Sequence, residues 1–186
     1  PDFNGIPVIP VFANSSRARR KMRRLLLYSI RNSTESIYLT TAYFIPGRRV
    51  LKALTNAALR GVNLKLLLPG KSDVLSVYYA GRSYYRRLLH AGVEIYEYQE
   101  AMLHAKTAIF DGCWNIIGSA NLDFQSMRRN EESNVGTFDR DFSQKMIHAF
   151  QNDISNSVRI DPATWAGRPL HHKLLEKFCS MIMKKL

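Results

Sequence analysis

Residues 103–123, LHAKTAIFDGCWNIIGSANLD, decide the fold class that we expect for this chain. Two short apolar runs flank Asp111-Gly112, a dipeptide that favours a two-residue type I′ hairpin turn because both central residues take positive φ. If residue 110 faces residue 113 across that turn, counting outward places His104 directly opposite Ser119. The stretch therefore predicts an antiparallel β-hairpin with polar residues near its open end.

Four polar side chains would gather on one face of this hairpin. Side chains two residues apart on a strand point to the same face, so His104 and Lys106 would lie together. Ser119 and Asn121 are also two residues apart and would lie on the same face as each other. Such a group suits a phosphate oxyanion, because Lys106 and Asn121 can donate to its non-bridging oxygens. At neutral pH the imidazole can attack phosphorus or protonate a departing alkoxide without a metal, so we expect neither a cofactor nor a metal site.

The rest of the chain alternates between strand-like and helix-like segments. We expect strands at residues 6–12, 36–41, 62–68 and 93–98, and helices at residues 15–32, 46–61 and 74–91. Repeated strand, helix, strand units predict an α/β fold, in which helices flank a mixed β-sheet.

The composition shifts after Ile160, where prolines and a glycine interrupt the alternation. We therefore expect a catalytic domain at residues 1–166 and a C-terminal amphipathic helix within residues 167–186. Apolar residues recur at helical spacing in this helix, which either packs on the domain or lies at the membrane surface.

The 186 residues, 46% of them hydrophobic, are enough for one folded core. A net charge of +12 favours phosphate-bearing partners, either lipid headgroups or nucleic acid. The basic segment at residues 17–24, RARRKMRR, fits a solvated helix face as well as a contact with anionic lipid.

The remaining composition excludes two classes of protein. No apolar run approaches the roughly 20 residues that a membrane-spanning helix needs, so we expect no transmembrane helix in this chain. Two cysteines are too few for a disulfide framework, which favours a reducing compartment. The start at Pro1 instead of Met favours a piece of a longer protein.

His104-x-Lys106, Asp111 and Gly118-Ser119-x-Asn121 together match the signature H-x-K-x4-D-x6-G-S-x-N of the phospholipase D superfamily at every position. The likeness extends to the segments TAYFIPGRRVLKAL, LRGVNLKLLLPGKSD, RSYYRRLLHAGVEIYEYQ, GSANLDFQS and RNEESNV. With them, the chain resembles the C-terminal half of a bacterial cardiolipin synthase.

This resemblance implies a phosphatidyltransferase that acts on phosphatidylglycerol through a phosphohistidine intermediate. Two motifs then form one active site, and this chain carries one of them. The second comes from a missing N-terminal half or from a second copy in a homodimer. In the two-motif arrangement His104 is implied to be the general acid and base, whereas in a homodimer either copy could attack. The resemblance also places the chain at the cytoplasmic face of the bacterial inner membrane, as a peripheral part of the enzyme.

Further site residues follow from the same resemblance. Glu132 falls where the family has a carboxylate that orients the opposing histidine, although the adjacent Glu131 leaves that assignment open by one residue. Asp111 belongs to the motif set but is implied to be structural, because it lies at the far end of the hairpin from His104. The matching segments also supply four predicted substrate contacts: Gly118, Gln125, Tyr43 and Arg82.

Two other functions remain open from the sequence. The first is a homodimeric phosphodiesterase that cuts nucleic acid, which the basic composition allows. The second is a half-site that binds anionic phospholipid and performs no chemistry alone. If the chain is a fragment, we expect poor activity unless it dimerises.

Overall fold

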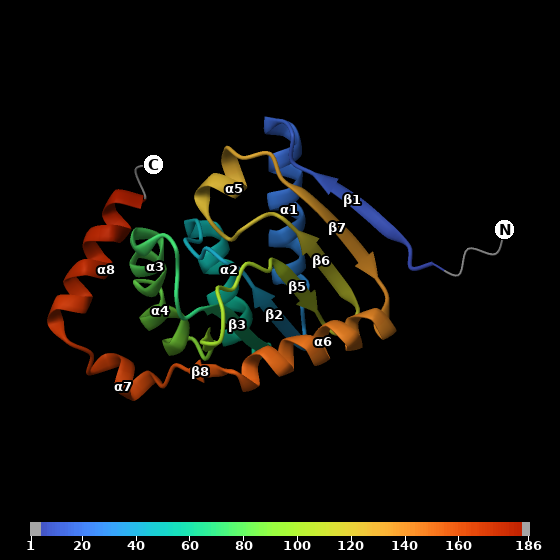
Figure 1. Ribbon diagram of the computed structural model, residues 1–186. Coiled ribbons are helices and arrows are strands. Elements are labelled where there is room, and N and C mark those ends of the chain that lie inside the picture. Colours follow the sequence, from blue (N-terminus) through green and yellow to red (C-terminus); the bar gives the residue numbers. More distant parts are fainter. Residues whose placement is uncertain (1–4, 184–186) are drawn as a thin grey trace.

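Eight strands form one mixed sheet in the computed structural model of the protein, which describes residues 5–183 (Figure 1). The strands are β1 (Val8–Phe12), β2 (Ser36–Thr40), β3 (Asn63–Pro69), β4 (Glu94–Tyr98), β5 (Thr107–Phe110), β6 (Trp114–Gly118), β7 (Ser133–Phe138) and β8 (Ser157–Arg159). Their order across the sheet is β1-β7-β6-β5-β2-β3-β4-β8. The neighbours β2, β3 and β4 run parallel and the other pairs are antiparallel, which confirms the predicted mixed sheet.

Helices cover both faces of this sheet. They are α1 (Ser16–Asn32), α2 (Arg48–Leu59), α3 (Leu75–Arg82), α4 (Tyr85–His90), α5 (Phe124–Arg128), α6 (Arg140–Ser155), α7 (Pro162–Ala166) and α8 (Leu170–Met183). The larger core cluster joins α1, α2 and α4 to one face through residues such as Ile37 and Leu66. A smaller cluster around Leu67 and Phe150 joins α6 to the other face, and Figure 1 shows α6 running across that side.

The predicted helix α1 is confirmed with Ser15 as its cap, and α2 is two residues shorter at each end than predicted. The hydroxyl of Ser15 accepts the N–H of Ala18 at 3.2 Å and caps α1. Helix α2 begins after Gly47 and ends just before Gly61, whose φ of 92° is a conformation that glycine adopts without steric cost. Strand β3 is buried on both faces over most of its length, as its continuous apolar sequence predicts.

The single helix predicted at residues 74–91 is wrong, because two helices occupy this segment. Tight i to i+3 bonds end α3: the N–H of Ser83 donates to Ala80, and the N–H of Tyr84 donates to Gly81. The Ser83 hydroxyl also donates to the Ala80 carbonyl at 2.6 Å. These local bonds replace the i to i+4 ladder and let the chain change direction before α4.

The hairpin turn between β5 and β6 lies where the sequence predicts it. Asp111 and Gly112 take positive φ values of 49° and 58°. The N–H of Cys113 donates to the carbonyl of Phe110 at 3.1 Å, which closes the turn. The Asp-Gly dipeptide therefore sets the turn, as its conformational preference requires.

The predicted register of the hairpin is wrong by one residue. The ladder starts with Phe110 opposite Trp114 instead of residue 113. Cys113 is an extra residue between turn and strand, and its carbonyl accepts the N–H of Asp139, at the end of the adjacent β7, at 2.9 Å. If the observed register continued past the strands, His104 would lie opposite Ala120 and not opposite Ser119. Ser119 and Asn121 would then project from the face opposite to that of His104 and Lys106, so the predicted gathering of all four side chains on one face does not follow from the strand pairing.

Helix α8 packs against α3, but not through the apolar stripe that its sequence suggests. Its buried side chains are Glu176, Cys179 and Ser180, and the carboxylate of Glu176 pairs with Arg168. The apolar residues at helical spacing are mostly exposed, with Leu170 at 75% and Phe178 at 57%. The helix thus contacts the domain and still presents apolar side chains to its surroundings. Its predicted place at a membrane surface stays a prediction.

Candidate active site

The motif residues lie together at one edge of the sheet. His104 and Lys106 directly precede β5, and Ser119 and Asn121 directly follow β6, so all four are at the end of the hairpin away from its turn. Because β5 runs antiparallel to β2, with Thr107 beside Thr40, this is also the edge where the chain leaves β2 and β3. Sites in α/β folds commonly form at the carboxyl ends of parallel strands.

Asn121 is held by the segment that leaves β2. Its Oδ1 accepts the backbone N–H of Tyr43 at 3.1 Å and the hydroxyl of Thr41 at 3.3 Å. A backbone N–H can only donate, so the atom that it meets must be the carboxamide oxygen. The carboxamide orientation is therefore fixed, and its NH₂ group is directed away from Tyr43. This is the group that we expect to donate to a bound oxyanion.

Ser119 and Glu132 are joined directly. The Ser119 hydroxyl donates to the Glu132 carboxylate and accepts the N–H of Ser133 at 3.0 Å. Glu132 is buried, whereas Glu131 is exposed. Of the two carboxylates that the sequence leaves open, Glu132 is the one in contact with the motif.

Lys106 is 9% exposed, and its ammonium hydrogen-bonds to the carbonyl of His104. Burial lowers the pKa of Lys106, because it disfavours the charged form, and this effect is opposed by the negative charges of Glu132, Asp123 and Asp73. The lysine therefore lies within electrostatic reach of the carboxylate that Ser119 contacts.

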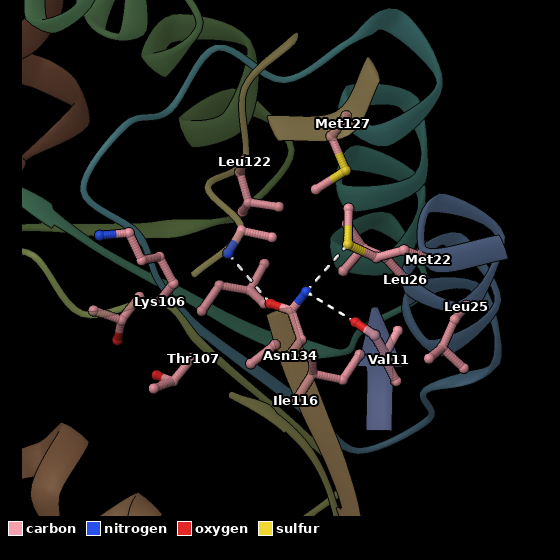
Figure 2. A pocket seen from close by; sticks show the side chains of 14 residues that line it. Val11, Met22, Leu25, Leu26, Lys106, Thr107, Ile116, Leu122, Met127 and Asn134 are labelled. Atoms are coloured by element: carbon pink, nitrogen blue, oxygen red, sulfur yellow. Dashed lines mark hydrogen bonds between the residues drawn. The ribbon is translucent and has the colours of Figure 1, made fainter. Parts of the chain in front are cut away.

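A small cavity of about 40 Å³ lies behind the motif, between α1 and the sheet (Figure 2). Its lining is mostly apolar, with Met22, Leu26 and Met127 on one side. Figure 2 shows the Lys106 stem at its edge with the ammonium pointing away from these side chains. Asn134, also part of the lining, donates to the Val11 carbonyl and to the Met22 sulfur. The cavity supports the lysine stem and is too small and apolar to hold a phosphoester.

His104 lies in the irregular segment before β5 and is exposed. An exposed imidazole is accessible to a substrate and to a second protein surface. That His104 and Asn121 reach the same oxyanion stays a prediction.

Asp111 has a structural role at the far end of the hairpin. Its carboxylate accepts the backbone N–H groups of Thr34, Glu35 and Ser36 at 2.9–3.2 Å. These three residues lead into β2, and the N–H of Asp111 donates to the Ser36 carbonyl at 2.9 Å. The carboxylate thus fixes the start of β2 against the turn.

The predicted substrate contacts differ in their surroundings. Tyr43 is at the motif edge, and its hydroxyl donates to the Asp73 carboxylate at 3.0 Å. Gln125 is exposed in the short helix α5, close in sequence to Asn121. A Cβ on Gly118 would lie 2.4 Å from the Ser133 carbonyl and from Asn134 Oδ1, so no larger residue fits at this position without a shift of its neighbours.

Arg82 is engaged elsewhere. Its guanidinium lies 3.5 Å from Glu97 and stacks on the rings of Tyr78 and Trp165. Burial raises the pKa of Glu97, and the positive charge of Arg82 partly offsets that shift. These contacts account for Arg82 as part of the packing between α3 and α7, and its substrate contact stays a prediction.

Two site residues, Thr41 and Asp73, have no counterpart among those predicted from the sequence. Thr41 accepts the N–H of Leu122 at 3.1 Å while it donates to Asn121, and so clamps the segment after β6. Asp73 binds the Tyr43 hydroxyl and acts on the charge of Lys106. Thr41 follows β2 and Asp73 follows β3, and these two strands are parallel. Because sites commonly form at the carboxyl ends of parallel strands, this position in the sequence could have indicated both residues.

A buried lysine, a carboxamide of fixed orientation, a buried carboxylate and an exposed histidine therefore lie around the end of the β5–β6 hairpin. The family described as "Cardiolipin synthase, PLD-like domain" matches residues 26–154. The chain belongs to this family.

Curated relatives carry the same family name. The chain is 39% identical over 155 residues to cardiolipin synthase 2 of Bacillus anthracis, an alignment that covers 83% of this chain and 30% of the relative. It is 32% identical over 185 residues to cardiolipin synthase A of Serratia proteamaculans, covering 95% of this chain and 38% of the relative. The chain therefore spans about a third of the length of the curated relatives that it matches.

Solved structures share the fold at low sequence identity. Nuc, a phospholipase D family member from Salmonella typhimurium, superposes with a TM-score of 0.70 at 20% identity and covers 84% of this chain and 99% of its own. The phosphatidylserine synthase of Haemophilus influenzae gives a TM-score of 0.76 at 14% identity, covering 98% of this chain and 47% of its own.

Within residues 5–183, no three or more His, Cys, Asp or Glu side chains are grouped so that they could hold a metal ion. In the same part of the chain, no helix has the length and apolar character to cross a membrane.

Proposed function

We propose that the chain is one half of the active site of a cardiolipin synthase-like phosphatidyltransferase that acts on phosphatidylglycerol. The observation that supports this proposal is that the motif residues flank the open end of the β5–β6 hairpin. There Lys106 and Asn121 would hold a phosphate beside His104. Membership of the cardiolipin synthase family supports the lipid substrate.

The proposed chemistry needs two histidines and no metal. One histidine attacks the lipid phosphorus, and the bond from phosphorus to the headgroup oxygen breaks as the other histidine protonates the departing alkoxide. The second histidine then removes a proton from the incoming alcohol, which attacks the phosphohistidine and releases the first imidazole. In an enzyme with two motifs we assign His104 to proton transfer.

Each neighbouring group has a role in this scheme. The Lys106 ammonium and the Asn121 NH₂ group would donate to the non-bridging oxygens as negative charge grows on them. Glu132 would orient the imidazole of the opposing motif by accepting its N–H. The Ser119 hydroxyl would hold Glu132 in place for that contact.

His104→Ala tests the proposal in a protein that supplies both motifs. We expect loss of phosphatidyl transfer between phosphatidylglycerol molecules, with an unchanged melting temperature because His104 is exposed. His90→Ala, in the last turn of α4 and also exposed, is the matched control and keeps full activity. Retained turnover in the His104 variant contradicts the assignment.

A homodimeric nuclease is the second candidate. The net charge of +12 favours it. Incubation of the purified chain with plasmid DNA in EDTA separates the candidates, because nicking without a metal supports the nuclease and inertness argues against it. Sedimentation analysis of the same sample tests whether two copies assemble, as this candidate requires.

The setting of the enzyme belongs to the proposal as well. We place the chain at the cytoplasmic face of the bacterial inner membrane, held there as a peripheral part of a longer enzyme. Flotation with phosphatidylglycerol and phosphatidylcholine vesicles tests this placement, and equal binding to both lipids argues against an anionic surface as the partner.

A further inference from the structure

A groove of about 840 Å³ lies beside the motif edge but is not lined by the motif residues. It is formed by α1, α2, α4 and α5, with Met183 of α8 at its border. Its volume is in the range of ligand pockets. The backbone N–H of Ile45 donates to the Leu122 carbonyl at 2.9 Å, so one wall of the groove is attached to the segment that carries Asn121.

Five arginines from four helices line this groove: Arg23, Arg48, Arg49, Arg87 and Arg128. The lining contains one acidic side chain, Asp123, whose carboxylate already accepts the N–H of Ser126 as the cap of α5. Ion pairs between described residues join Arg82, Arg159 and Arg168 to glutamates, and no groove arginine takes part in one. The positive charge of the groove is therefore not balanced by neighbouring carboxylates.

The arginines are close enough to repel one another. The pKa of Arg23 is lowered, first by partial burial and then by the positive charges of Arg128 and Arg49, with Arg20 and Arg24 contributing. Like charges held together on a folded surface disfavour the fold unless an anion offsets them. Repulsion between Arg23, Arg49 and Arg128 thus indicates where an anion would bind.

The start of α2 adds backbone donors at the same place. Gly47 provides no side-chain cap, and the first turn of this 12-residue helix contains no acidic residue. Gly47, Arg48 and Arg49 all line the groove. The first N–H groups of the helix, with the positive end of its dipole, favour an anion between them and the arginines.

The floor of the groove is apolar. Ile45, Leu51 and Met127 are buried and line it. A free phosphate would leave these apolar side chains in contact with water, whereas a phosphodiester that carries an apolar chain would cover them.

A single-stranded nucleic acid fits the groove less well, because it binds by stacking bases on open aromatic faces. The ring of Phe124 is instead covered by the guanidinium groups of Arg128 and Arg129 at 4.8 and 5.7 Å. Tyr84, the other aromatic residue of the lining, is buried.

We propose that this groove binds the phosphodiester of an anionic phospholipid, with Arg23, Arg49 and Arg128 on the phosphate and the buried apolar side chains against the start of the acyl chain. The site is separate from the motif and holds a lipid without reacting with it. The inference goes beyond the proposed function, since it concerns binding and not phosphatidyl transfer.

Paired substitutions in the full chain test the site. Arg49→Gln with Arg128→Gln removes two groove charges, and Arg140→Gln with Lys145→Gln removes two exposed charges from α6 on the other face of the sheet. We expect the groove pair to weaken binding to phosphatidylglycerol vesicles about tenfold or more and the α6 pair to change it by about twofold or less. Equal losses in the two pairs, or no loss in the groove pair, overturn the proposal.

Unfolding of the groove variant is not expected, because removal of like charges relieves repulsion, and its melting temperature should equal or exceed that of the wild type. A measurement on the unmodified protein gives an independent test. Dihexanoyl phosphatidylglycerol should shift the side-chain NMR signals of Arg23, Arg49 and Arg128, and an absence of shifts contradicts the site.

Two further probes identify the ligand. Glycerol 3-phosphate should bind at least about tenfold more weakly than dihexanoyl phosphatidylglycerol, because it leaves the apolar floor exposed. Equal affinity shows a site for a free phosphoester, and displacement of the lipid by a single-stranded oligonucleotide shows a nucleic-acid site; either result overturns the lipid assignment. The NMR shifts at Arg23, Arg49 and Arg128 should persist in His104→Ala, because these arginines lie outside the motif, so loss of phosphatidyl transfer and loss of groove binding are measured separately.

Discussion

The hydroxyl of Ser119 donates a hydrogen bond to the buried carboxylate of Glu132. This contact joins the end of β6 to the start of β7, and the same carboxylate acts on the charge of Lys106. Glu132 therefore lies between two motif residues. An unpaired carboxylate beside a phosphate site would repel the substrate. The contact with Ser119 and the nearby charge of Lys106 offset the negative charge of Glu132.

Glu132→Gln tests this role in a protein that supplies both motifs. The glutamine can still accept from Ser119 but carries no charge to orient an imidazolium, so we expect turnover to fall about 10- to 100-fold. Glu131→Gln, at the adjacent exposed position, is the control and should keep its activity. Equal effects of the two substitutions, measured as the rate of phosphatidyl transfer, would show that Glu132 has no special role.

Lys106→Met tests the electrostatics of the buried ammonium. Because burial lowers the lysine pKa below 10.5, the folded chain loses this proton at a lower pH than the unfolded chain. The charged lysine therefore disfavours folding near neutral pH, and this penalty disappears as the pH rises towards 10.5. We expect the variant to lack transfer activity and to be more stable than the wild type near neutral pH.

Urea unfolding of both proteins across this pH range measures the difference, which should narrow as the pH approaches 10.5. Tyrosines titrate in both proteins and cancel in the comparison. A variant less stable than the wild type by more than about 1 kcal/mol near neutral pH would mean that the attraction of Glu132, Asp123 and Asp73 outweighs burial.

Asp111→Ala should destabilise the fold without any direct effect on phosphate binding. The substitution removes three backbone hydrogen bonds to a charged acceptor and places alanine at positive φ, so we expect a loss of about 3 kcal/mol in unfolding free energy. Asp111→Asn keeps an acceptor and tolerates this φ, so it should lose about 1 kcal/mol. If the two variants prove equally stable, the carboxylate does not fix the start of β2.

Gly118→Ala should be strongly destabilising for a steric reason. The new methyl group would lie 2.4 Å from the Ser133 carbonyl and from Asn134 Oδ1, so β6 and β7 must separate. We expect a loss of about 3 kcal/mol, whereas Gly5→Ala, which meets nothing within 4 Å, should be neutral. Wild-type stability with weakened substrate binding would instead favour the substrate contact that the sequence predicts.

Local signals predicted much of this fold. Ser15 as a cap, Gly61 after α2 and the Asp111-Gly112 turn are each determined by the conformational preference of one or two residues. The register of the hairpin was not predictable in this way, because the carbonyl of Cys113 is held by a residue at the end of β7. A two-residue turn specifies how the chain reverses and leaves open how many residues precede the first ladder pair.

Long-range contacts account for what the sequence could not supply. The position of Thr41 and Asp73 after parallel strands indicates that they lie near the site, but no spacing pattern reveals that their hydrogen-bond partners are Asn121 and Tyr43. For α8, helical periodicity correctly indicated a helix but not its buried face. Packing on α3 uses the small side chains of Cys179 and Ser180, together with Glu176 paired to Arg168.

The central claim is that His104, Lys106 and Asn121 bind one oxyanion. A crystal structure of the protein soaked in tungstate, a phosphate analogue, tests it most directly. The account predicts one anion within about 3.2 Å of the Lys106 Nζ and Asn121 Nδ2 atoms and of a ring nitrogen of His104. An anion bound elsewhere, with the imidazole and the carboxamide turned to opposite sides of the hairpin, would contradict it.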